Sequence, residues 1–160
     1  MKVDFTNYLG RFPEIELPVT LRDDSNHDFE ANPPLQDDMI EQYITHYEAV
    51  EVDDFTEYMA CFQVPKSEKF QALVYWKAAL MNYDFVISTY GKDGNMIDKK
   101  AIAGIKVVGQ NISRSIATIH EDLAISIAEG IELSNGDFDP DTTKARRFQI
   151  LDNGLIEQEY

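Results

Sequence analysis

From Phe55 onward the chain is a succession of strand-length segments, each rich in β-branched and aromatic residues and followed by a short turn signal. Residues of these two kinds are enriched in β-strands. The links are only a few residues long, which favours antiparallel pairing between neighbours along the chain. We therefore predict a meandering antiparallel sheet of about six to eight strands. The candidate strands are residues 55–64, 70–78, 83–90, 95–103, 113–120, 123–133, 146–151 and 155–160.

Part of this region, residues 112–127, also fits a helical period through its isoleucines and Leu123. The same residues alternate in polarity around the polar pair Glu121-Asp122 and are dense in isoleucine. Alternation with a period of two is typical of a half-buried strand, so we interpret the segment as two strands.

The sequence TYGKDGNMID, residues 89–98, resembles a calcium-binding loop at first sight. With Gly94 at the sixth position of an EF-hand loop, Thr89 and Gly91 occupy two ligand positions. Lys100 then stands where a bidentate glutamate is needed. Asp-Gly between two strand-like segments instead predicts a hairpin turn, because glycine readily adopts a positive φ. The sequence Asp152-Asn153-Gly154 predicts a second such hairpin.

The first fifty residues have a different pattern. Phe5, Tyr8, Leu9 and Phe12 form a helical stripe that ends before Pro13, and Asp4 can cap it. A short extended piece follows around residues 14–19, then a polar loop over residues 22–34 and a second helix over about residues 35–47. We predict an α+β fold in which a two-helix N-terminal segment packs against the sheet. One domain is expected to span residues 1–160, with an acidic helical part at 1–50 and the sheet at 55–160.

Charge is distributed unevenly along the chain. Its formal net charge is -15, and no lysine or arginine occurs between Arg22 and Lys66, a span that contains twelve acidic residues. Residues 61–120 have the opposite balance, a net charge of +4. An acidic surface argues against direct binding to nucleic acid or to anionic membranes. No apolar leader or membrane-length run is visible, and the single cysteine cannot form an internal disulfide, so we expect a cytoplasmic protein.

Few residues point to specific chemistry. Cys61 lies in a predicted strand and is interpreted as a buried hydrophobe, and His27, His46 and His120 show no zinc-binding spacing. Asp137, Asp139 and Asp141 alternate in a loop and are the weakest candidates for a metal site. The sequence lacks the motifs of common hydrolases, kinases and dinucleotide-binding proteins. We predict no catalytic residues, no metal and no cofactor.

The leading hypothesis is a non-enzymatic protein that binds a basic macromolecular partner, possible partners being basic proteins, through its acidic N-terminal third. Its candidate binding residues are Glu48, Glu51, Asp53 and Asp54. A merely solvated acidic face is an equally simple interpretation. The alternative function is a small-molecule-binding protein or enzyme with an aromatic-lined pocket in the curved sheet. Trp76 is the candidate residue for that pocket.

Overall fold

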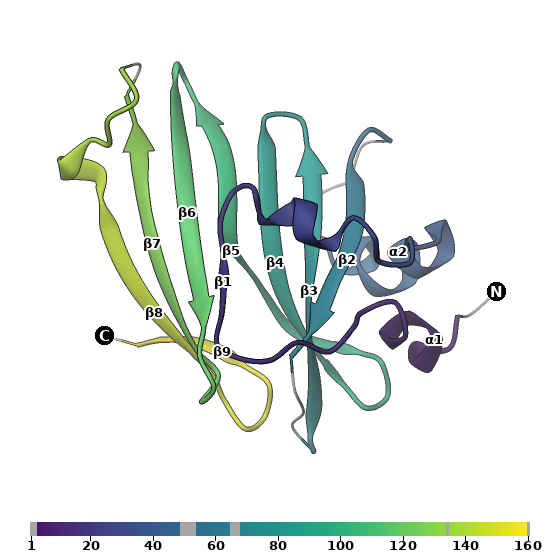
Figure 1. Cartoon of the computed structure of the whole chain (residues 1–160). Coiled ribbons are helices and arrows are strands. Elements are labelled where there is room, and N and C mark those ends of the chain that lie inside the picture. The colour runs from purple at the N-terminus through teal and green to yellow at the C-terminus, as the bar shows by residue number, and fades with distance from the viewer. Residues whose placement is uncertain (1–2, 49–53, 65–67, 134, 160) are drawn as a thin grey trace.

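A computed structural model of the chain describes residues 3–48, 54–64, 68–133 and 135–159. Its main element is an antiparallel sheet in which the last eight strands pair in chain order. All eight predicted strands are confirmed, including the two in the ambiguous segment. They are β2 (Glu57–Gln63), β3 (Phe70–Ala79), β4 (Asn82–Gly91), β5 (Met96–Val108), β6 (Asn111–Ile119), β7 (Ala124–Glu132), β8 (Lys144–Ile150) and β9 (Ile156–Glu159) (Figure 1).

A ninth strand makes the sheet larger than predicted. Strand β1 (Val19–Leu21) begins at the last residue of the segment that was expected to be extended, and it pairs antiparallel with the end of β6. Val19 and Thr20 are β-branched, but three residues are too short a run to predict a strand. The pairing depends on β6, whose register places Ala117–Ile119 opposite β1 and leaves β5 to pair with the other end of the strand.

Helices occupy less of the N-terminal part than predicted. Helix α1 (Phe5–Leu9) begins at the predicted cap, where the Asp4 side chain accepts a hydrogen bond from Thr6 N. Helix α2 (Asp37–Tyr43) stops short of residue 47 because Ile44 leaves the helical region, and a short 3-10 helix, η2 (Thr45–Tyr47), follows. Two further 3-10 helices, η1 (Ser25–Phe29) and η3 (Pro140–Thr142), lie in loops. The coarse prediction of an antiparallel sheet with two short packed helices is confirmed.

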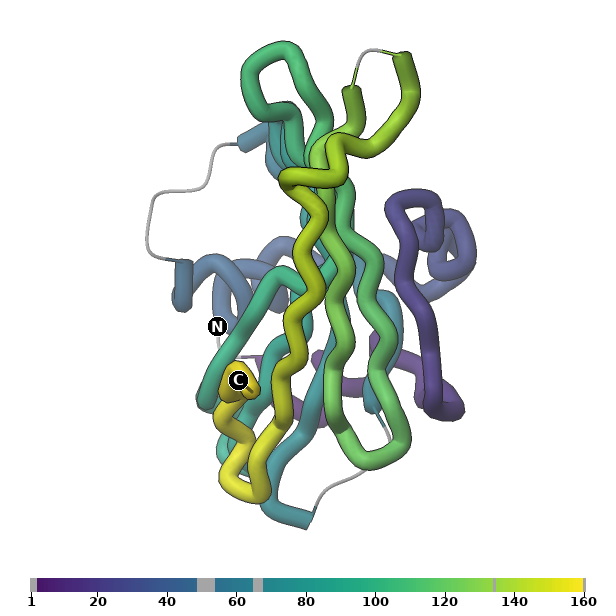
Figure 2. Tube along the Cα trace, turned by 90° about the vertical axis from the view of Figure 1, so that its left-hand side faces the viewer, coloured from purple at the N-terminus to yellow at the C-terminus, as the bar shows by residue number. Residues whose placement is uncertain are grey.

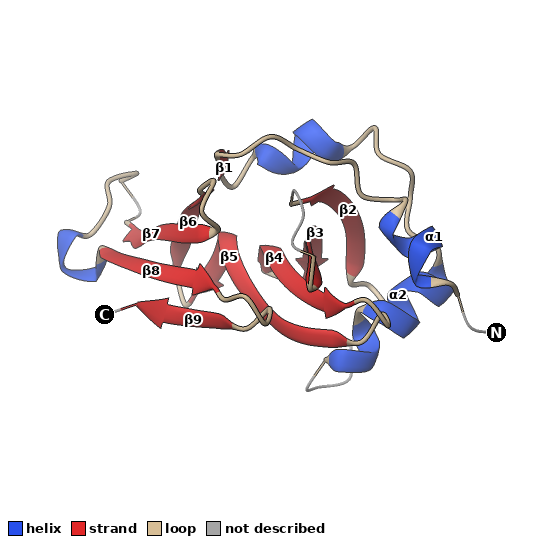
Figure 3. Ribbon diagram, turned by 90° about the horizontal axis from the view of Figure 1, so that it is seen from below, coloured by secondary structure: helices blue, strands red, loops and turns tan. Residues whose placement is uncertain are grey.

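The sheet has apolar side chains on both faces at β3. Tyr75 packs with α1 and α2 in one cluster, whereas Trp76 packs in the other, larger cluster between the curved strands. Adjacent strand residues point to opposite faces, so this division follows from the period of two. Helices α1 and α2 therefore cover one face of β3 and β4, at the end of the molecule away from β8 and β9 (Figure 3).

The N-terminal segment crosses the open side of the curved sheet (Figures 1 and 3). It begins at β2, where Gln63 N donates to Pro13 O at 2.9 Å, and it ends beside β6 as β1. Seen from the side of β8, this purple segment runs next to the green strands (Figure 2). The β8–β9 end of the sheet also curls inward. Ile156 N of β9 donates a hydrogen bond to Asp98 Oδ2 of β5 at 2.8 Å.

Both predicted hairpin turns are confirmed. In the first, Gly94 has φ +86° and donates to Gly91 O at 3.0 Å, while Asp93 Oδ1 accepts from Asn95 N at 3.0 Å. Gly154 has φ +90° in an equivalent turn between β8 and β9. The same hydrogen bonds recur between β6 and β7, where Leu123 takes the positive φ, and around Gly136 after β7. Asp93 thus closes a turn by accepting hydrogen bonds, as the hairpin interpretation requires.

Candidate functional site

A cleft of about 680 Å³ lies between α2–η2 and the β4–β5 turn. We call it the α2 cleft. The helical side supplies Asp38 and Glu41, and the turn supplies Asp93. None of the lining residues that the structure describes is a lysine or arginine. Its lining residues are Asp38, Glu41, Gln42, Tyr43, His46, Tyr47, Asp93, Gly94 and Asn95.

Buried tyrosines hold α2 in place beside the sheet. The hydroxyl group of Tyr90 in β4 donates a hydrogen bond to Tyr43 O at 2.6 Å. The rings of Tyr8 and Tyr43 stack with their centroids 4.5 Å apart. Tyr43 in turn donates to Val3 O. On the other side of the cleft, Met96 N donates to Tyr47 Oη at 3.2 Å, which ties η2 to the start of β5. These contacts give the α2 cleft a rigid aromatic base.

The three carboxylates of the α2 cleft carry unneutralised charge. Within the described residues, no lysine, arginine or histidine lies within 4.0 Å of the side chains of Asp38, Glu41 or Asp93. Hydrogen bonds from the backbone and side chain of Asn95 lower the pKa of Asp93, so this group is a carboxylate at neutral pH. The cleft therefore presents negative charge on two sides.

A second cleft, of about 580 Å³, lies between α1 and α2. Asp38 lines both clefts, and Asp4 lies on the α1 side of the second. Arg11 is the one cation among the described residues that line it, and this guanidinium donates to Pro34 O at 3.3 Å. Carboxylates therefore line a cleft on each side of α2.

The structure describes two of the four acidic residues that the sequence analysis named as candidate binding residues, Glu48 and Asp54. Glu48 has a side chain only 11% exposed and forms ion pairs with Lys77 and Lys99, so it contributes no free charge to a surface. Asp54 is exposed just before β2. Glu51 and Asp53 lie outside the described residues.

Sequence reasoning overlooked the acidic residues of the α2 cleft. Asp38 and Glu41 are three positions apart in the helix, which places them on one face, and this spacing was a usable signal. Asp93 was considered only as part of a turn or metal loop. Its position opposite α2 depends on how the β4–β5 hairpin lies under the helices, and no local pattern reveals that.

The aromatic candidate of the alternative hypothesis lies in the core. Trp76 is 9% exposed, and its ring lies 4.7 Å from that of Phe85 and stacks on Tyr83 at 5.9 Å. Tyr75, which faces the other side of the sheet, is 1% exposed. Cross-strand packing thus accounts for both side chains, and Trp76 offers little surface to a ligand.

The three aspartates that the sequence suggested as metal ligands lie in the loop between β7 and β8, where they take part in local hydrogen bonds. Asp139 Oδ1 accepts from Asp141 N at 3.0 Å and caps η3, while Asp137 N donates to the Asn135 side chain. Among the described residues there is no group of three histidine, cysteine, aspartate or glutamate side chains arranged to hold a metal ion. Cys61 is fully buried, as predicted, and its thiol donates weakly to Met59 O at 3.7 Å.

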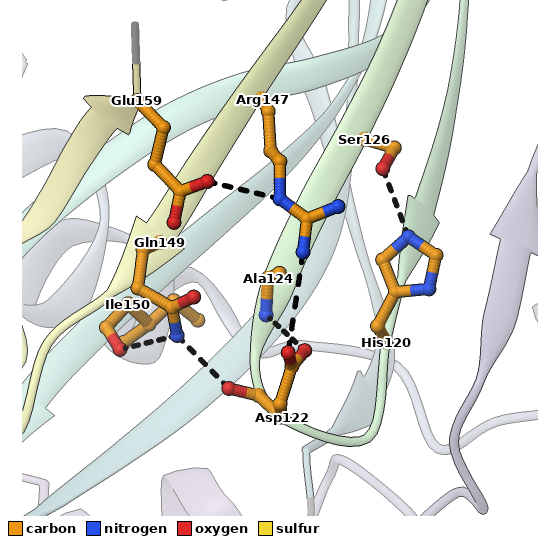
Figure 4. Close-up of polar contacts among 8 residues, drawn as sticks. All are labelled: His120, Asp122, Ala124, Ser126, Arg147, Gln149, Ile150 and Glu159. Carbon is orange, nitrogen blue, oxygen red and sulfur yellow. Dashed lines mark hydrogen bonds and ion pairs between the residues drawn. The ribbon is translucent and has the colours of Figure 1, made fainter.

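His120 lies at the β6–β7 turn, where Nε2 is 2.8 Å from Ser126 Oγ (Figure 4). In the part of the chain that the structure describes, Nδ1 of this imidazole has no hydrogen-bond partner that would orient it as a base. The neighbouring Asp122 instead accepts from Ala124 N at 3.0 Å and lies 4.0 Å from Arg147 Nη2. Arg147 also donates to Glu159 Oε2 at 2.9 Å, so these contacts join the turn to β8 and β9 (Figure 4).

No protein family model, curated protein or solved structure matches this chain. None of the described helices has the length and apolar composition needed to cross a membrane.

Proposed function

We propose that this chain is a non-enzymatic interaction protein that binds a lysine- or arginine-rich segment of a partner protein in the α2 cleft. One observation carries the proposal: Asp38, Glu41 and Asp93 converge on one cleft without a cation among the described residues. The proposal keeps the acidic N-terminal third as the binding region. It replaces Glu48 by acidic residues that form no ion pair with the described residues.

The physical reason is electrostatic. Like charges gathered on one surface repel one another and lower the stability of the folded state. A basic segment would relieve this repulsion, and the long-range field of a protein with a net charge of -15 would accelerate the encounter. Arginine would gain most, because its guanidinium forms bidentate hydrogen bonds with carboxylates.

The aromatic base of the cleft suits the same ligand. Tyr47 and His46 line the cleft together with the acidic residues, and their rings meet edge to face at 4.9 Å. Lysine and arginine side chains lay their methylene stems on apolar surfaces while their charged ends reach polar groups. Tyrosine rings also attract cations placed over their faces.

The test compares two variants that remove the same amount of charge. One variant carries Asp38→Asn, Glu41→Gln and Asp93→Asn in the cleft. The control carries Glu121→Gln, Asp152→Asn and Glu157→Gln, three exposed acidic residues elsewhere. Binding of a fluorescent nona-arginine peptide is measured by anisotropy at low and high salt. We expect the cleft variant to bind about tenfold more weakly than the control, with a weaker salt dependence.

Equal affinity of the two variants would overturn the proposal. That result would mean that the peptide responds only to net charge and that the acidic surface is merely solvated. An affinity of the cleft variant equal to that of the unmodified protein would overturn it as well.

A further inference from the structure

A second kind of site lies on the other side of the molecule, between β5 and the curled strands β7 and β8. A pocket of about 260 Å³ opens there, and we call it the β5–β8 pocket. Its floor is apolar, because Ile102, Ile127 and Phe148 are each at most 6% exposed. The curvature of the sheet brings β8 round towards β5, as Figure 3 shows.

A bulge in β5 shapes one wall of this pocket. Phe85 pairs with Ala103 and Val86 with Ala101, which leaves Ile102 as the extra residue. Two positions later Gly104 has φ +142°, and a Cβ there would lie 1.9 Å from Tyr83 O. Bulges bend a strand and redirect its side chains, and they are common near functional sites. Lys100 and Lys106, which come before and after the bulge in the chain, both line the pocket.

The pocket collects positive charge in a strongly acidic protein. Lys100, Lys106 and Arg146 line it together with two carboxylates, Asp84 and Glu129. Lys100 Nζ lies 4.3 Å from the centre of the Phe148 ring. Arg146 is paired with Glu129 at 3.0 Å. Neither lysine has a carboxylate of the described residues within 4.0 Å. Two cations therefore remain available to an anion above the apolar floor.

The same pocket contains a polar atom that lacks a partner. Asn82 Oδ1 is buried and has no hydrogen-bond partner among the described residues. A buried oxygen without a hydrogen bond is unfavourable, so a donor at this position would be favoured. Burial raises the pKa of the neighbouring Asp84, against the opposing effects of Lys77, Lys106 and a side-chain hydrogen bond from Asn82. The amide nitrogen of Asn82 thus faces Asp84, and its oxygen is the group left to accept.

We propose that the β5–β8 pocket binds a small hydroxylated organic anion, either a carboxylate or a phosphate ester. Lys100 and Lys106 bind the anionic group by charge-assisted hydrogen bonds. Asn82 Oδ1 accepts a hydrogen bond from a ligand hydroxyl, and the short carbon skeleton lies on Ile127 and Phe148. The pocket volume is below the usual range for drug-sized ligands, which limits the ligand to a small metabolite. This site and its ligand are independent of the basic partner proposed for the α2 cleft.

The test uses glycerol 3-phosphate and glycerate as probes, with glycerol as the uncharged control. Binding is followed by backbone amide chemical shifts in two-dimensional NMR of the whole chain. We expect either or both anions to shift amides of residues 82–84, 100–106, 127–129 and 146–148, whereas glycerol leaves them unchanged. A response to glycerol 3-phosphate alone would assign the site to phosphate esters, and a response to glycerate alone to carboxylates.

Three variants make the test specific. Lys106→Gln and Lys100→Met remove the two free cations, and Lys92→Gln removes an exposed lysine in the β4–β5 turn. The dissociation constant is expected to rise about tenfold in each of the first two variants and to stay unchanged in the third. The proposal is overturned if neither anion binds, if glycerol binds as well as the anions, or if Lys92→Gln weakens binding as much as Lys106→Gln.

Discussion

Glu48 Oε2 accepts a hydrogen bond from Lys99 Nζ at 3.1 Å, although the two residues lie 51 positions apart. The other oxygen of the same carboxylate accepts from Lys77 Nζ at 3.2 Å. One acidic residue after η2 thus joins the helical part of the chain to β3 and β5. A carboxylate that looks like part of an acidic surface in the sequence is a structural link in the fold.

Glu48→Gln should therefore lower the free energy of unfolding by about 1–2 kcal/mol, because two half-buried ammonium groups lose their counter-ion. Glu41→Gln is the matched control, since this residue is exposed on α2, and its effect should stay within about 0.5 kcal/mol. Urea unfolding curves of the two variants give the comparison. Equal midpoints would show that the contacts of Glu48 contribute nothing to stability.

Gly→Ala substitutions at Gly94 and Gly136 distinguish the stability cost of backbone strain from the cost of side-chain crowding. Gly94 and Gly136 have nearly the same φ, +86° and +89°, but a Cβ at Gly94 would lie 3.2 Å from Phe5 whereas nothing lies within 4 Å of one at Gly136. Each Gly→Ala change should cost about 1–2 kcal/mol from the positive φ alone. Thermal unfolding should show the larger loss for Gly94→Ala. A larger loss for Gly136→Ala would contradict the contact with α1.

The β4–β5 turn should be indifferent to calcium. Asp93 is committed to Asn95 by hydrogen bonds from the backbone and the side-chain amide, at 3.0 and 2.9 Å. Millimolar calcium should leave the melting temperature unchanged. A rise in melting temperature that disappears in Asp93→Ala would show that the loop binds metal after all.

Cys61 should be unreactive in the folded protein. Burial raises the pKa of this thiol, and the thiolate is the nucleophile. Labelling by a thiol reagent at neutral pH should therefore be slow and should accelerate only on unfolding in urea. Cys61→Ala should cost about 1 kcal/mol from the small cavity. Rapid labelling without denaturant would contradict the burial of the side chain.

Alkaline pH should unfold the protein through its buried tyrosines. Burial raises the pKa of Tyr90 to about 12, and it also raises the pKa values of Tyr8 and Tyr75. A phenol with a raised pKa in the folded state stabilises the fold fully below the unfolded pKa of about 10, and this contribution is lost as the pH rises towards 12. The midpoint of urea unfolding should fall over that window.

Tyr90→Phe provides the internal check on this pH dependence. The variant loses the hydrogen bond to Tyr43 O, which should cost about 1 kcal/mol at neutral pH. It also loses one buried ionisable group, so its stability should decline less steeply above pH 10. A decline as steep as in the unmodified protein would show that Tyr90 does not take part.

The sequence by itself determined the elements that depend on local geometry. Gly94 and Gly154 revealed hairpins because few other residues tolerate a positive φ, and the adjacent Tyr75 and Trp76 had to face opposite sides of a strand. The stripe that includes Tyr8 and Phe12 likewise predicted which side of the first helical segment is buried. Each of these inferences needs only a neighbour a few positions away.

Tertiary structure alone decided which distant side chains meet. β1 pairs with β6 because the N-terminal segment crosses the curved sheet, and Asp93 faces Glu41 because the β4–β5 hairpin ends beneath α2. The ion pairs of Glu48 arise in the same way. Lys100 reaches Phe148 because strand twist and the bulge at Ile102 curl β8 towards β5. Small rotations accumulate over many residues into such curvature, and a hydrophobic period of two is the same in a flat sheet and in a coiled one.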